Sequence, residues 1–398
     1  MKEYDIIIVG IGPAGMGAAS SLIKSKLKVC LIDSGITINP VLVTAKKTIE
    51  KFKLKKAVIQ NYNKFSLYSK NYGFSKRFPK GLEWVAVDVK KAKDIMKKKL
   101  DFDLVDDTEI IEAKRQGRKI VLTDFRGNKY RAKIVIDASG NAAVIAKSLG
   151  LKTKSKAYFF CYAVELENCN IKDPYEFSWD VNPDYTNGAF NMYPYSKKKG
   201  QFVIADFEPY TLASEEDLKR RLLLAIKKER PYNNYFKNAR IIKDSEFSAV
   251  FPLQAIPRMV DDNLLVVGSS AGQVTPSIGE GFRPGIELGY IAGEIAEKAV
   301  EENNVSEERL KEFEEIWKKT YGKNQFLMKM VRHIGSYFNN EEHDLALKAM
   351  QRLNINEFLK YFTSEMGLGI FFKCLSFKLL FVWLRNRILF FNNQNEKR

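Results

Sequence analysis

Histidine and cysteine are scarce in this sequence. Two histidines, His333 and His343, and four cysteines are present among 398 residues. The cysteines stand at positions 30, 161, 169 and 374, and no two of them form a CxxC pair. Zinc sites and His-based catalytic triads require such residues at suitable spacing. We therefore expect no metal site, and the lack of paired cysteines favours a reducing, cytoplasmic setting.

The sequence also lacks a long uncharged apolar run. It opens with MKEYD and passes straight into a strand-like segment, so we expect no signal peptide. The apolar stretch at 369–391, GIFFKCLSFKLLFVWLRNRILFF, is interrupted by four basic residues, Lys373, Lys378, Arg385 and Arg387. It is too interrupted for a spanning helix. A basic helix rich in Leu and aromatics suits a membrane interface, and a helix packed on the protein's own core is the alternative.

Acidic residues are outnumbered: 48 Asp and Glu stand against 65 Lys and Arg, which gives a net charge of +17. Such a balance favours anionic partners such as nucleic acid, anionic lipid or phosphorylated substrates, and it is equally compatible with a Lys-rich solvated surface. No nucleic-acid-binding motif accompanies the charge, so we expect no nucleic-acid partner.

The most informative segment is YDIIIVGIGPAGMGAASSLIKSKLKVCLIDSG, residues 4–35. A β-branched strand leads into GxGxxG, formed by Gly10, Gly12 and Gly15, and a helical pattern follows. A second strand ends on Asp33, about twenty residues on, within one βαβ unit. The first glycine permits a tight turn, the second admits a pyrophosphate, and the third lets the helix pack on the sheet. The fingerprint predicts a dinucleotide whose ribose contacts Asp33, without choosing between NAD and FAD.

The rest of the chain predicts further elements. Residues 36–80 look irregular, with a Lys-rich helical stretch at 44–58. A strand and a helix follow from 82, and 104–140 reads as several strands with turns at 116–118 and 126–128. Residues 157–210 alternate as in an antiparallel sheet, 214–229 form an amphipathic helix, and 290–398 are almost entirely helical in pattern. No second GxGxxG follows a strand, so we expect no separate nicotinamide domain.

Three segments in chain order carry a resemblance: GIGPAG with Asp33, then VIDASGN, then GSSAGQVTPSIGEGF. They resemble the FAD-binding fold of glutathione-reductase-like and p-hydroxybenzoate-hydroxylase-like flavoproteins, in which the late segment contacts the flavin. Over nearly the whole chain the sequence is similar to the geranylgeranyl reductase family, including archaeal reductases of prenyl-ether lipids. The resemblance implies an α/β fold with a Rossmann-like FAD-binding domain (1–155 and 246–300), an antiparallel-sheet substrate domain (156–245) and a helical C-terminal region (301–398).

The resemblance also implies site residues. The expected cofactor contacts are Gly10, Gly12, Pro13, Ala14, Gly15, Asp33, Lys90, Ile110, Gly140, Ser269, Gly281 and Phe282. Lys90 stands where the family usually has Arg, and Ser269 where it has the Asp of a Gly-Asp motif. The family's aromatic substrate motif appears here as GAFNMYPY, which makes Tyr193 and Pro194 the expected substrate contacts. The family often has a Cys-Gly pair after the second strand, and residues 36–50 contain no cysteine.

The activity that follows from this resemblance is hydride transfer from reduced FAD to a C=C bond of a prenyl lipid. Tyr193 or solvent supplies the proton, and a ferredoxin, a deazaflavin or a nicotinamide supplies the electrons. A flavin monooxygenase or halogenase of the same fold is one alternative, although no WxWxIP-type halogenase motif is present. A non-enzymatic lipid-binding protein that retains FAD is the other. We expect a cytoplasmic protein that attaches peripherally to anionic membranes.

Overall fold

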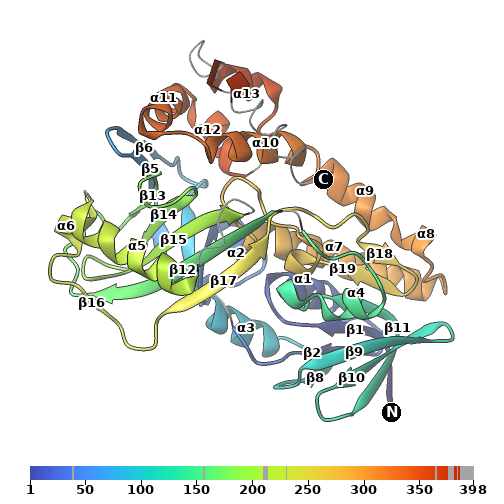
Figure 1. Ribbon diagram of the computed structural model, residues 1–398. Helices are drawn as coiled ribbons and strands as arrows, with labels where there is room; N and C mark the ends of the chain where they lie inside the picture. Colours follow the sequence, from blue (N-terminus) through green and yellow to red (C-terminus); the bar gives the residue numbers. More distant parts are fainter. Residues whose placement is uncertain are drawn as a thin grey trace.

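The computed structural model describes residues 1–37, 40–155, 157–208, 214–229, 231–363, 365–374, 381–382 and 384–385. It contains two large sheets and a small one, with helices gathered at the C-terminal end (Figure 1). This arrangement confirms the predicted fold class: a parallel cofactor-type sheet, an antiparallel sheet and a helical C-terminal region.

The first sheet has a parallel centre ordered β8, β2, β1, β11, β19. Its strands are β1 (Lys2–Val9), β2 (Val29–Ile32), β8 (Asp103–Val105), β11 (Lys129–Asp137) and β19 (Leu264–Val266). Three further strands pair antiparallel at its margins: β9 (Ile110–Gln116), β10 (Lys119–Asp124) and β18 (Val260–Asp261). The central strands are buried on both faces, which explains their continuous β-branched runs.

Two helices far apart in the sequence pack against each other beside this sheet: α1 (Pro13–Leu22) and α7 (Phe282–Glu301). Glycines make the approach possible. A Cβ on Gly289 would lie 1.9 Å from the carbonyl oxygen of Ala14, and one on Gly17 would lie 2.0 Å from that of Ile286. The helix that follows the late Gly-rich segment is thereby fixed against the helix that follows the first Gly-rich turn.

The second sheet runs β16, β12, β15, β14, β13, β5, β6, with β17 also paired to β12. Its strands are β5 (Lys64–Ser69), β6 (Gly73–Arg77), β12 (Tyr158–Glu167), β13 (Glu176–Val181), β14 (Ala189–Pro194), β15 (Lys199–Glu208), β16 (Arg240–Ile241) and β17 (Phe247–Pro252). Every pair is antiparallel except β13 with β5. The sheet therefore takes strands from 64–77 and 247–252, outside the predicted 156–245 segment.

The prediction that 36–80 is irregular is wrong. Besides β5 and β6, this segment supplies β3 (Val41–Ala45) and β4 (Val58–Tyr62), which flank β7 (Trp84–Asp88) in the small sheet. The predicted helix at 44–58 is reduced to α2 (Lys46–Lys51) and the short η1 (Lys55–Ala57). β4 and β6 each expose alternate residues to solvent, so their polar side chains conceal short strands in the sequence.

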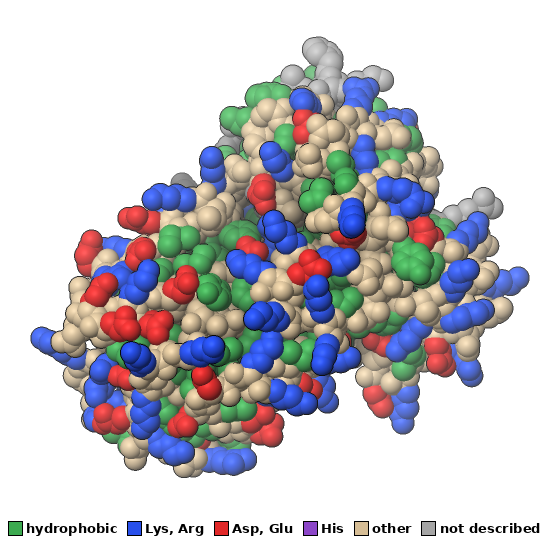
Figure 2. Space-filling model, turned by 180° about the vertical axis from the view of Figure 1, so that it is seen from behind, with side chains coloured by type: hydrophobic (Ala, Val, Ile, Leu, Met, Phe, Trp, Pro, Cys, Tyr) green, Lys and Arg blue, Asp and Glu red, His purple; other side chains and the backbone are tan. Residues whose placement is uncertain are grey.

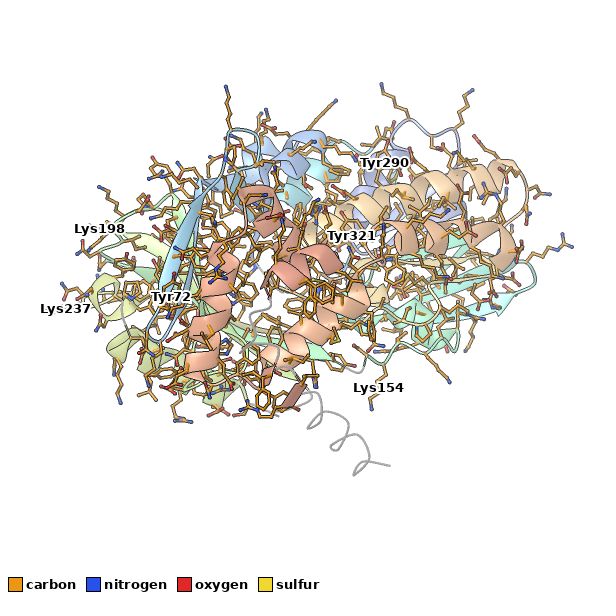
Figure 3. All side chains as sticks on the ribbon, turned by 90° about the horizontal axis from the view of Figure 1, so that it is seen from above. Tyr72, Lys154, Lys198, Lys237, Tyr290 and Tyr321 are labelled. Carbon is orange, nitrogen blue, oxygen red and sulfur yellow. The ribbon has the colours of Figure 1, made fainter. Side chains whose placement is uncertain are left out.

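The remaining helices cover the sheets. They are α3 (Val89–Lys97), η2 (Gly140–Ala142), α4 (Val144–Ser148), α5 (Glu215–Lys228), α6 (Tyr232–Tyr235), η3 (Gly268–Ala271), α8 (Glu307–Leu310), α9 (Glu312–Lys319), α10 (Gln325–Gly335), α11 (Asn340–Gln351), α12 (Ile355–Phe362) and α13 (Leu368–Cys374). Seen from above, α10–α13 lie across the molecule between Tyr72 and Tyr321 (Figure 3). Phe358 and Phe362 of α12 pack on Phe65 of β5, which joins the C-terminal helices to the second sheet.

Basic side chains are spread over the rear face rather than gathered in one patch, and acidic and hydrophobic side chains lie among them (Figure 2). None of the helices formed by the described residues combines the length and apolar character needed to cross a bilayer. Of the basic residues in the predicted interfacial helix, Lys373 and Arg385 are described, and Lys378 and Arg387 lie outside the described residues.

Candidate active site

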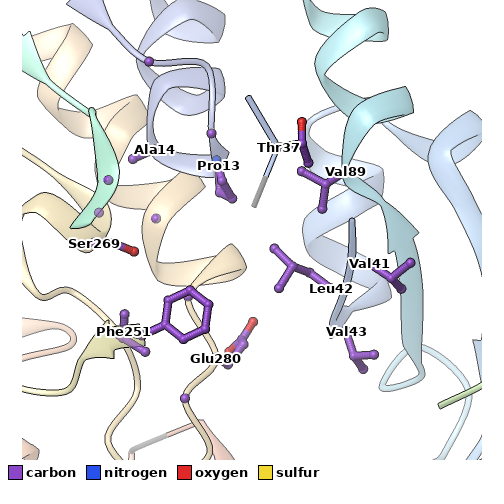
Figure 4. A pocket seen from close by; sticks show the side chains of 18 of the residues that line it. Pro13, Ala14, Thr37, Val41, Leu42, Val43, Val89, Phe251, Ser269 and Glu280 are labelled. Carbon is purple, nitrogen blue, oxygen red and sulfur yellow. The ribbon is translucent and has the colours of Figure 1, made fainter. Parts of the chain in front are cut away.

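A cavity of about 420 Å³ lies where the carboxyl ends of the parallel strands meet the second and third sheets. In Figure 4, Pro13, Ala14, Ser269 and Glu280 form one wall, and β3 with the start of α3 forms the wall opposite. Ligands of open parallel sheets bind outside the carboxyl ends of the strands, so the fold itself favours this place.

The glycine turn after β1 forms the floor of the cavity. Gly10 has φ +94°, and a Cβ there would lie 2.5 Å from the carbonyl oxygen of Ala138. A Cβ on Gly15 would lie 1.7 Å from the carbonyl oxygen of Gly10. Gly12 differs, because a Cβ there would meet nothing within 4 Å. The first and third glycines are required by the protein's own packing, and the second leaves free space for a ligand.

Helix α1 begins at Pro13, and both Pro13 and Ala14 line the cavity. The first N–H groups of a helix have no carbonyl partner within the helix, and they carry the positive end of the helix dipole. An anionic group in front of Gly12 is stabilised by both effects. The open space at Gly12 and this helix start together can accommodate a pyrophosphate.

Asp33, at the end of β2, is held firmly at the cavity wall. Its carboxylate accepts hydrogen bonds from the backbone N–H of Ile11 at 3.0 Å and of Gly35 at 3.1 Å. The ammonium of Lys93 lies 3.1 Å from Oδ2 and that of Lys97 lies 3.8 Å away. The contacts from Ile11 and Gly35 are hydrogen bonds, and the two lysine contacts are ion pairs. A carboxylate has about four lone-pair positions, so Asp33 retains acceptor capacity for a ribose hydroxyl.

The assignment of Lys90 to the cofactor is corrected by the structure. Lys90 is exposed on α3 and does not line the cavity, whereas Lys93, one turn later, is buried and does. The buried face of α3 consists of Val89, Ala92, Lys93 and Met96. That i, i+3, i+4, i+7 spacing was present in the sequence and identifies Lys93 as the inward-facing lysine.

Asp137 joins two of the predicted cofactor loops. It is fully buried, and its Oδ1 accepts from the Ser139 hydroxyl at 2.6 Å and from that of Ser270 at 3.4 Å. Ser270 also donates to the carbonyl of Gly140 at 2.9 Å. Burial raises the pKa of Asp137. Through its hydrogen bonds to Ser139 and Ser270, the carboxyl positions the loop after β11 against η3. Gly140 of that loop lines the cavity.

The other predicted cofactor residues divide into two groups. Ile110, Ser269 and Gly281 line the cavity. So do the other predicted residues Gly10, Gly12, Pro13, Ala14, Asp33 and Gly140. Gly15 and Phe282 do not: Gly15 supports the first turn from below, and Phe282 is a fully buried core residue at the start of α7. Their contribution is to packing behind the cavity wall.

One end of the cavity is aromatic. Its rings come from the second sheet and the C-terminal helices and include Phe65, Phe177, Trp179, Tyr193 and Phe362. Burial raises the pKa of the Tyr193 hydroxyl, which therefore stays protonated. Pro194 does not line the cavity. Its carbonyl accepts from the Tyr62 hydroxyl at 2.8 Å, which places it among the structural contacts.

The sequence analysis missed Glu280, which lies on the cavity wall just before α7. Its Oε1 accepts from the Thr44 hydroxyl at 2.8 Å and from the backbone N–H of Arg283 at 3.2 Å. Its Oε2 is buried and has no hydrogen-bond partner among the described residues. Burial raises the pKa of this carboxyl, although the nearby Arg283 opposes the shift. A carboxyl inside the Gly-rich segment 279–281 was the available signal.

Among the described residues, no group of three or more His, Cys, Asp or Glu side chains is placed to hold a metal ion. The cavity instead brings together an open glycine turn, a buried acid with acceptor capacity and an aromatic chamber along one continuous space. That combination suits a dinucleotide that carries a large ring system.

Comparison with known proteins identifies the dinucleotide. The sequence model of the FAD dependent oxidoreductases matches residues 5–214, which is more than half of the chain. The chain belongs to this family. The flavoprotein is 27% identical over 391 residues to a digeranylgeranylglycerophospholipid reductase from Methanocaldococcus jannaschii, with 93% of this chain and 97% of that one covered.

Solved structures agree on the fold of this flavoprotein. A geranylgeranyl bacteriochlorophyll reductase-like protein from Thermoplasma acidophilum superposes with a TM-score of 0.83 at 16% identity, over 98% of this chain and 100% of that one. The p-nitrophenol 4-monooxygenase of Pseudomonas putida superposes with a TM-score of 0.70 at 13% identity, over 92% and 99%. The predicted cofactor, FAD, and the enzyme class, a geranylgeranyl reductase-like FAD-dependent oxidoreductase, are confirmed.

Proposed function

We propose that this flavoprotein reduces C=C bonds in the prenyl chains of a lipid. The observation that carries the proposal is the continuity of the cavity, which leads from the pyrophosphate turn at Gly12 to a chamber of aromatic side chains. An isolated alkene has no carbonyl to polarise it, so its reduction requires close apolar contact rather than hydrogen bonding. The relatedness to digeranylgeranylglycerophospholipid reductases supports a prenyl lipid over other apolar substrates.

In this function the protein positions the cofactor and excludes water. The turn at Gly12 and the start of α1 hold the pyrophosphate, and Asp33, oriented by Lys93, holds a ribose. When bound, reduced FAD supplies the hydride. Phe177 and Trp179 pack against the substrate chain and keep the reacting bond dry.

The second hydrogen arrives as a proton, and Glu280 is well placed to hold it. Because burial raises its pKa, its carboxyl keeps a proton to higher pH than an exposed glutamate would. Arg283 Nε lies 3.7 Å from Oε2, and Arg283 Nη1 lies 3.2 Å from the half-exposed Glu365. The Arg283 guanidinium thus connects the buried Glu280 to the surface by charge, while its own protons stay in place. Tyr193 is another protonated group at the cavity wall.

The source of the electrons lies outside the chain. The sequence has no second dinucleotide fingerprint, so reduction by a ferredoxin, a free deazaflavin or a transiently bound nicotinamide fits the protein best. A nicotinamide would have to approach the same cavity from solvent.

The experiment is single turnover without oxygen. The flavin is reduced chemically, a geranylgeranyl lipid is added, and the flavin spectrum and lipid mass are followed together. We expect the oxidised spectrum to return as the lipid gains two hydrogens per reduced bond; the protein without FAD is the control. Reoxidation that requires oxygen and adds an oxygen atom to the lipid would identify a monooxygenase. Lipid binding without reoxidation would identify a lipid-binding protein that retains FAD.

A further inference from the structure

A second cavity, of about 170 Å³, lies between the C-terminal helices and the second sheet. Apolar side chains from α10, α11 and α12 form most of its wall, and Leu67 and Phe207 close it on the sheet side. Trp179 and Phe362 line both this cavity and the larger one. The two spaces therefore lie on opposite sides of a shared wall of two aromatic side chains.

One charged side chain among the described residues interrupts this apolar lining, namely Arg332 of α10. Its Nε and Nη1 are buried and have no hydrogen-bond partner in the part of the chain that the structure describes. The guanidinium lies 4.9 Å from the centre of the Phe207 ring. The other titratable groups of the lining are His343, Tyr361 and Cys374. Burial lowers the pKa of His343 to about 4 and raises the pKa of Tyr361 to about 12 and that of Cys374 to about 11, so all three are neutral at pH 7.

Buried N–H groups of a cation that have no partner are costly, although Arg332 as a whole is only partly buried. Burial lowers the pKa of Arg332 to about 10, which still leaves it charged at neutral pH. None of the ion pairs among the described residues involves Arg332, although other partly buried arginines such as Arg221, Arg283 and Arg309 each have carboxylate partners. Stacking on Phe207 offsets a small part of the desolvation cost. An anion from outside the chain would accept hydrogen bonds from these two unpaired nitrogens, Nε and Nη1.

We propose that Arg332 binds the phosphate of the substrate lipid, while its prenyl chain passes beside Trp179 and Phe362 into the flavin cavity. This proposal rests on the function proposed above. A guanidinium binds phosphate through paired, charge-assisted hydrogen bonds. The apolar lining around Arg332 suits the first units of an isoprenoid chain and suits a soluble phosphometabolite poorly.

The surroundings of the cavity favour a lipid as the source of the phosphate. Phe371 and Cys374 of α13 line it, and on the same helix Leu368 and Phe372 are 62% and 63% exposed. An apolar, exposed helix thus lies directly beside the Arg332 cavity. A lipid that leaves a bilayer meets apolar surface on the way to the charged group.

The test compares two ligands that differ only in the phosphate, geranylgeranyl phosphate and geranylgeraniol. Binding to the FAD-loaded protein is followed by quenching of tryptophan fluorescence, which Trp179 in the cavity wall reports. We expect wild type to bind the phosphate ester at least about tenfold more tightly than the alcohol, since hydrogen bonds to charged groups are worth that much or more. Arg332→Met should bind the two ligands equally.

Two further variants separate charge from folding. Arg332→Lys keeps the charge and loses the paired geometry, so it should retain part of the preference. Arg352→Met, at an exposed arginine beyond the end of α11, should retain all of it. An undiminished preference in Arg332→Met, or in Arg332→Gln if the Met variant does not fold, would overturn the proposal and leave Arg332 as a structural partner of Phe207.

Inorganic phosphate separates the two sources of the anion. Millimolar phosphate should displace geranylgeranyl phosphate weakly, because it lacks the apolar contacts. Displacement at micromolar phosphate would indicate a site for the free ion and overturn the lipid assignment. The proposed function fails on a different result, namely a wild-type protein that prefers the phosphate ester yet reduces neither lipid.

Discussion

The ammonium of Lys93 lies 3.1 Å from Oδ2 of Asp33, and both side chains are about 5% exposed. The contact joins α3 to the end of β2, so the carboxylate that we propose meets the cofactor's ribose is already neutralised and oriented by the protein. The Lys93 ammonium also donates to the carbonyl of Ile36 at 3.0 Å. Lys93 therefore fixes both the acid and the segment that follows it.

This contact predicts that Lys93→Met weakens FAD binding about tenfold or more, because removal of one partner of a buried pair leaves the other charge uncompensated. The dissociation constant is measured by titrating FAD into the apoprotein and following flavin fluorescence. Lys90→Met, on the exposed face of the same helix, is the matched control and should bind FAD like wild type. Equal loss in both variants would contradict the placement of Lys93 at the cofactor.

The first glycine turn gives a second prediction. Gly12→Leu should fold normally and lose FAD, because a side chain there enters open space that the pyrophosphate requires. Gly15→Leu should fail earlier, as its Cβ would collide with the Gly10 carbonyl at 1.7 Å. Circular dichroism and thermal melting of the two apoproteins, together with the flavin spectrum, distinguish the effects. Retained flavin in Gly12→Leu would place the pyrophosphate elsewhere.

The sequence predicted the cofactor half of the molecule well, because its constraints are local. Gly10, Gly12, Gly15 and Asp33 lie within one βαβ unit whose spacing follows from the geometry of the turn. The Gly-rich pattern of the late segment, together with the family resemblance, was enough to predict that this segment returns to the cofactor site. Helix α7, which follows this late segment, packs on α1 through Gly289, so the first and the late segments meet at one site.

Features that depend on distant partners were missed. β5 belongs to the second sheet because it pairs with β13, more than a hundred residues later, and nothing near residue 64 signals this. Arg332 became a candidate only when the fold surrounded it with apolar side chains, whereas Glu280 had a signal in its Gly-rich segment that was not used. Lys93 is different, because the helical spacing of the sequence already indicated that it faces inward. The prediction chose Lys90, one turn earlier on the same helix.

Glu280 and Tyr193 can be separated by pH. Because the pKa of Glu280 is raised, its carboxyl is protonated at low pH and loses the proton as pH rises through that raised value. If it is the donor, single-turnover flavin reoxidation by the lipid slows as pH rises. Glu280→Gln should be slow at every pH, by about a hundredfold as is typical for loss of a general acid, and Tyr193→Phe should keep the wild-type profile.

The control for that experiment is binding. Both variants should hold FAD and lipid with affinities close to wild type, since neither substitution changes the shape of the cavity wall by more than an atom. A flat profile in wild type, or loss of the pH-dependent decline in Tyr193→Phe, would assign the proton to Tyr193 or to solvent.

Asp180 predicts a stability effect that is independent of the cofactor. Burial, with a smaller contribution from the charge of Glu229, raises its pKa from 3.8 to about 7. Between these values the folded state holds a proton that the unfolded state has released, so the free energy of unfolding falls as pH rises. Above about pH 7 this loss is complete.

Asp180→Asn removes that titration. Urea unfolding between pH 4.5 and 8 should show a decline in wild type that is smaller in the variant, by several kcal/mol at most over the range. The variant should be relatively more stable at pH 8 than at pH 4.5 when compared with wild type. Parallel curves for the two proteins would show that Asp180 is not a source of the decline.

The last prediction concerns α13, where one helix presents two different faces. Ile370 and Phe371 pack against the C-terminal core, whereas Leu368 and Phe372 are exposed. The described residue Phe381 beyond it is 70% exposed as well. We expect this exposed apolar surface to bind bilayers. Lys373 is paired with Glu357, so the electrostatic assistance comes from the net charge of +17 on the whole protein.

Phe372→Asp should therefore weaken co-sedimentation with anionic vesicles at low salt while leaving the melting temperature and FAD content unchanged, because its side chain is 63% exposed. Ile370→Asp is the contrasting variant on the packed face and should lower the melting temperature. Binding of wild type should fall with added salt and on neutral vesicles, since screening removes the electrostatic part. If Phe372→Asp sediments like wild type, the exposed face of α13 has no part in membrane attachment. If it precipitates or loses FAD, the helix is structural, and access of the lipid to Arg332 must be sought at another edge of the C-terminal helices.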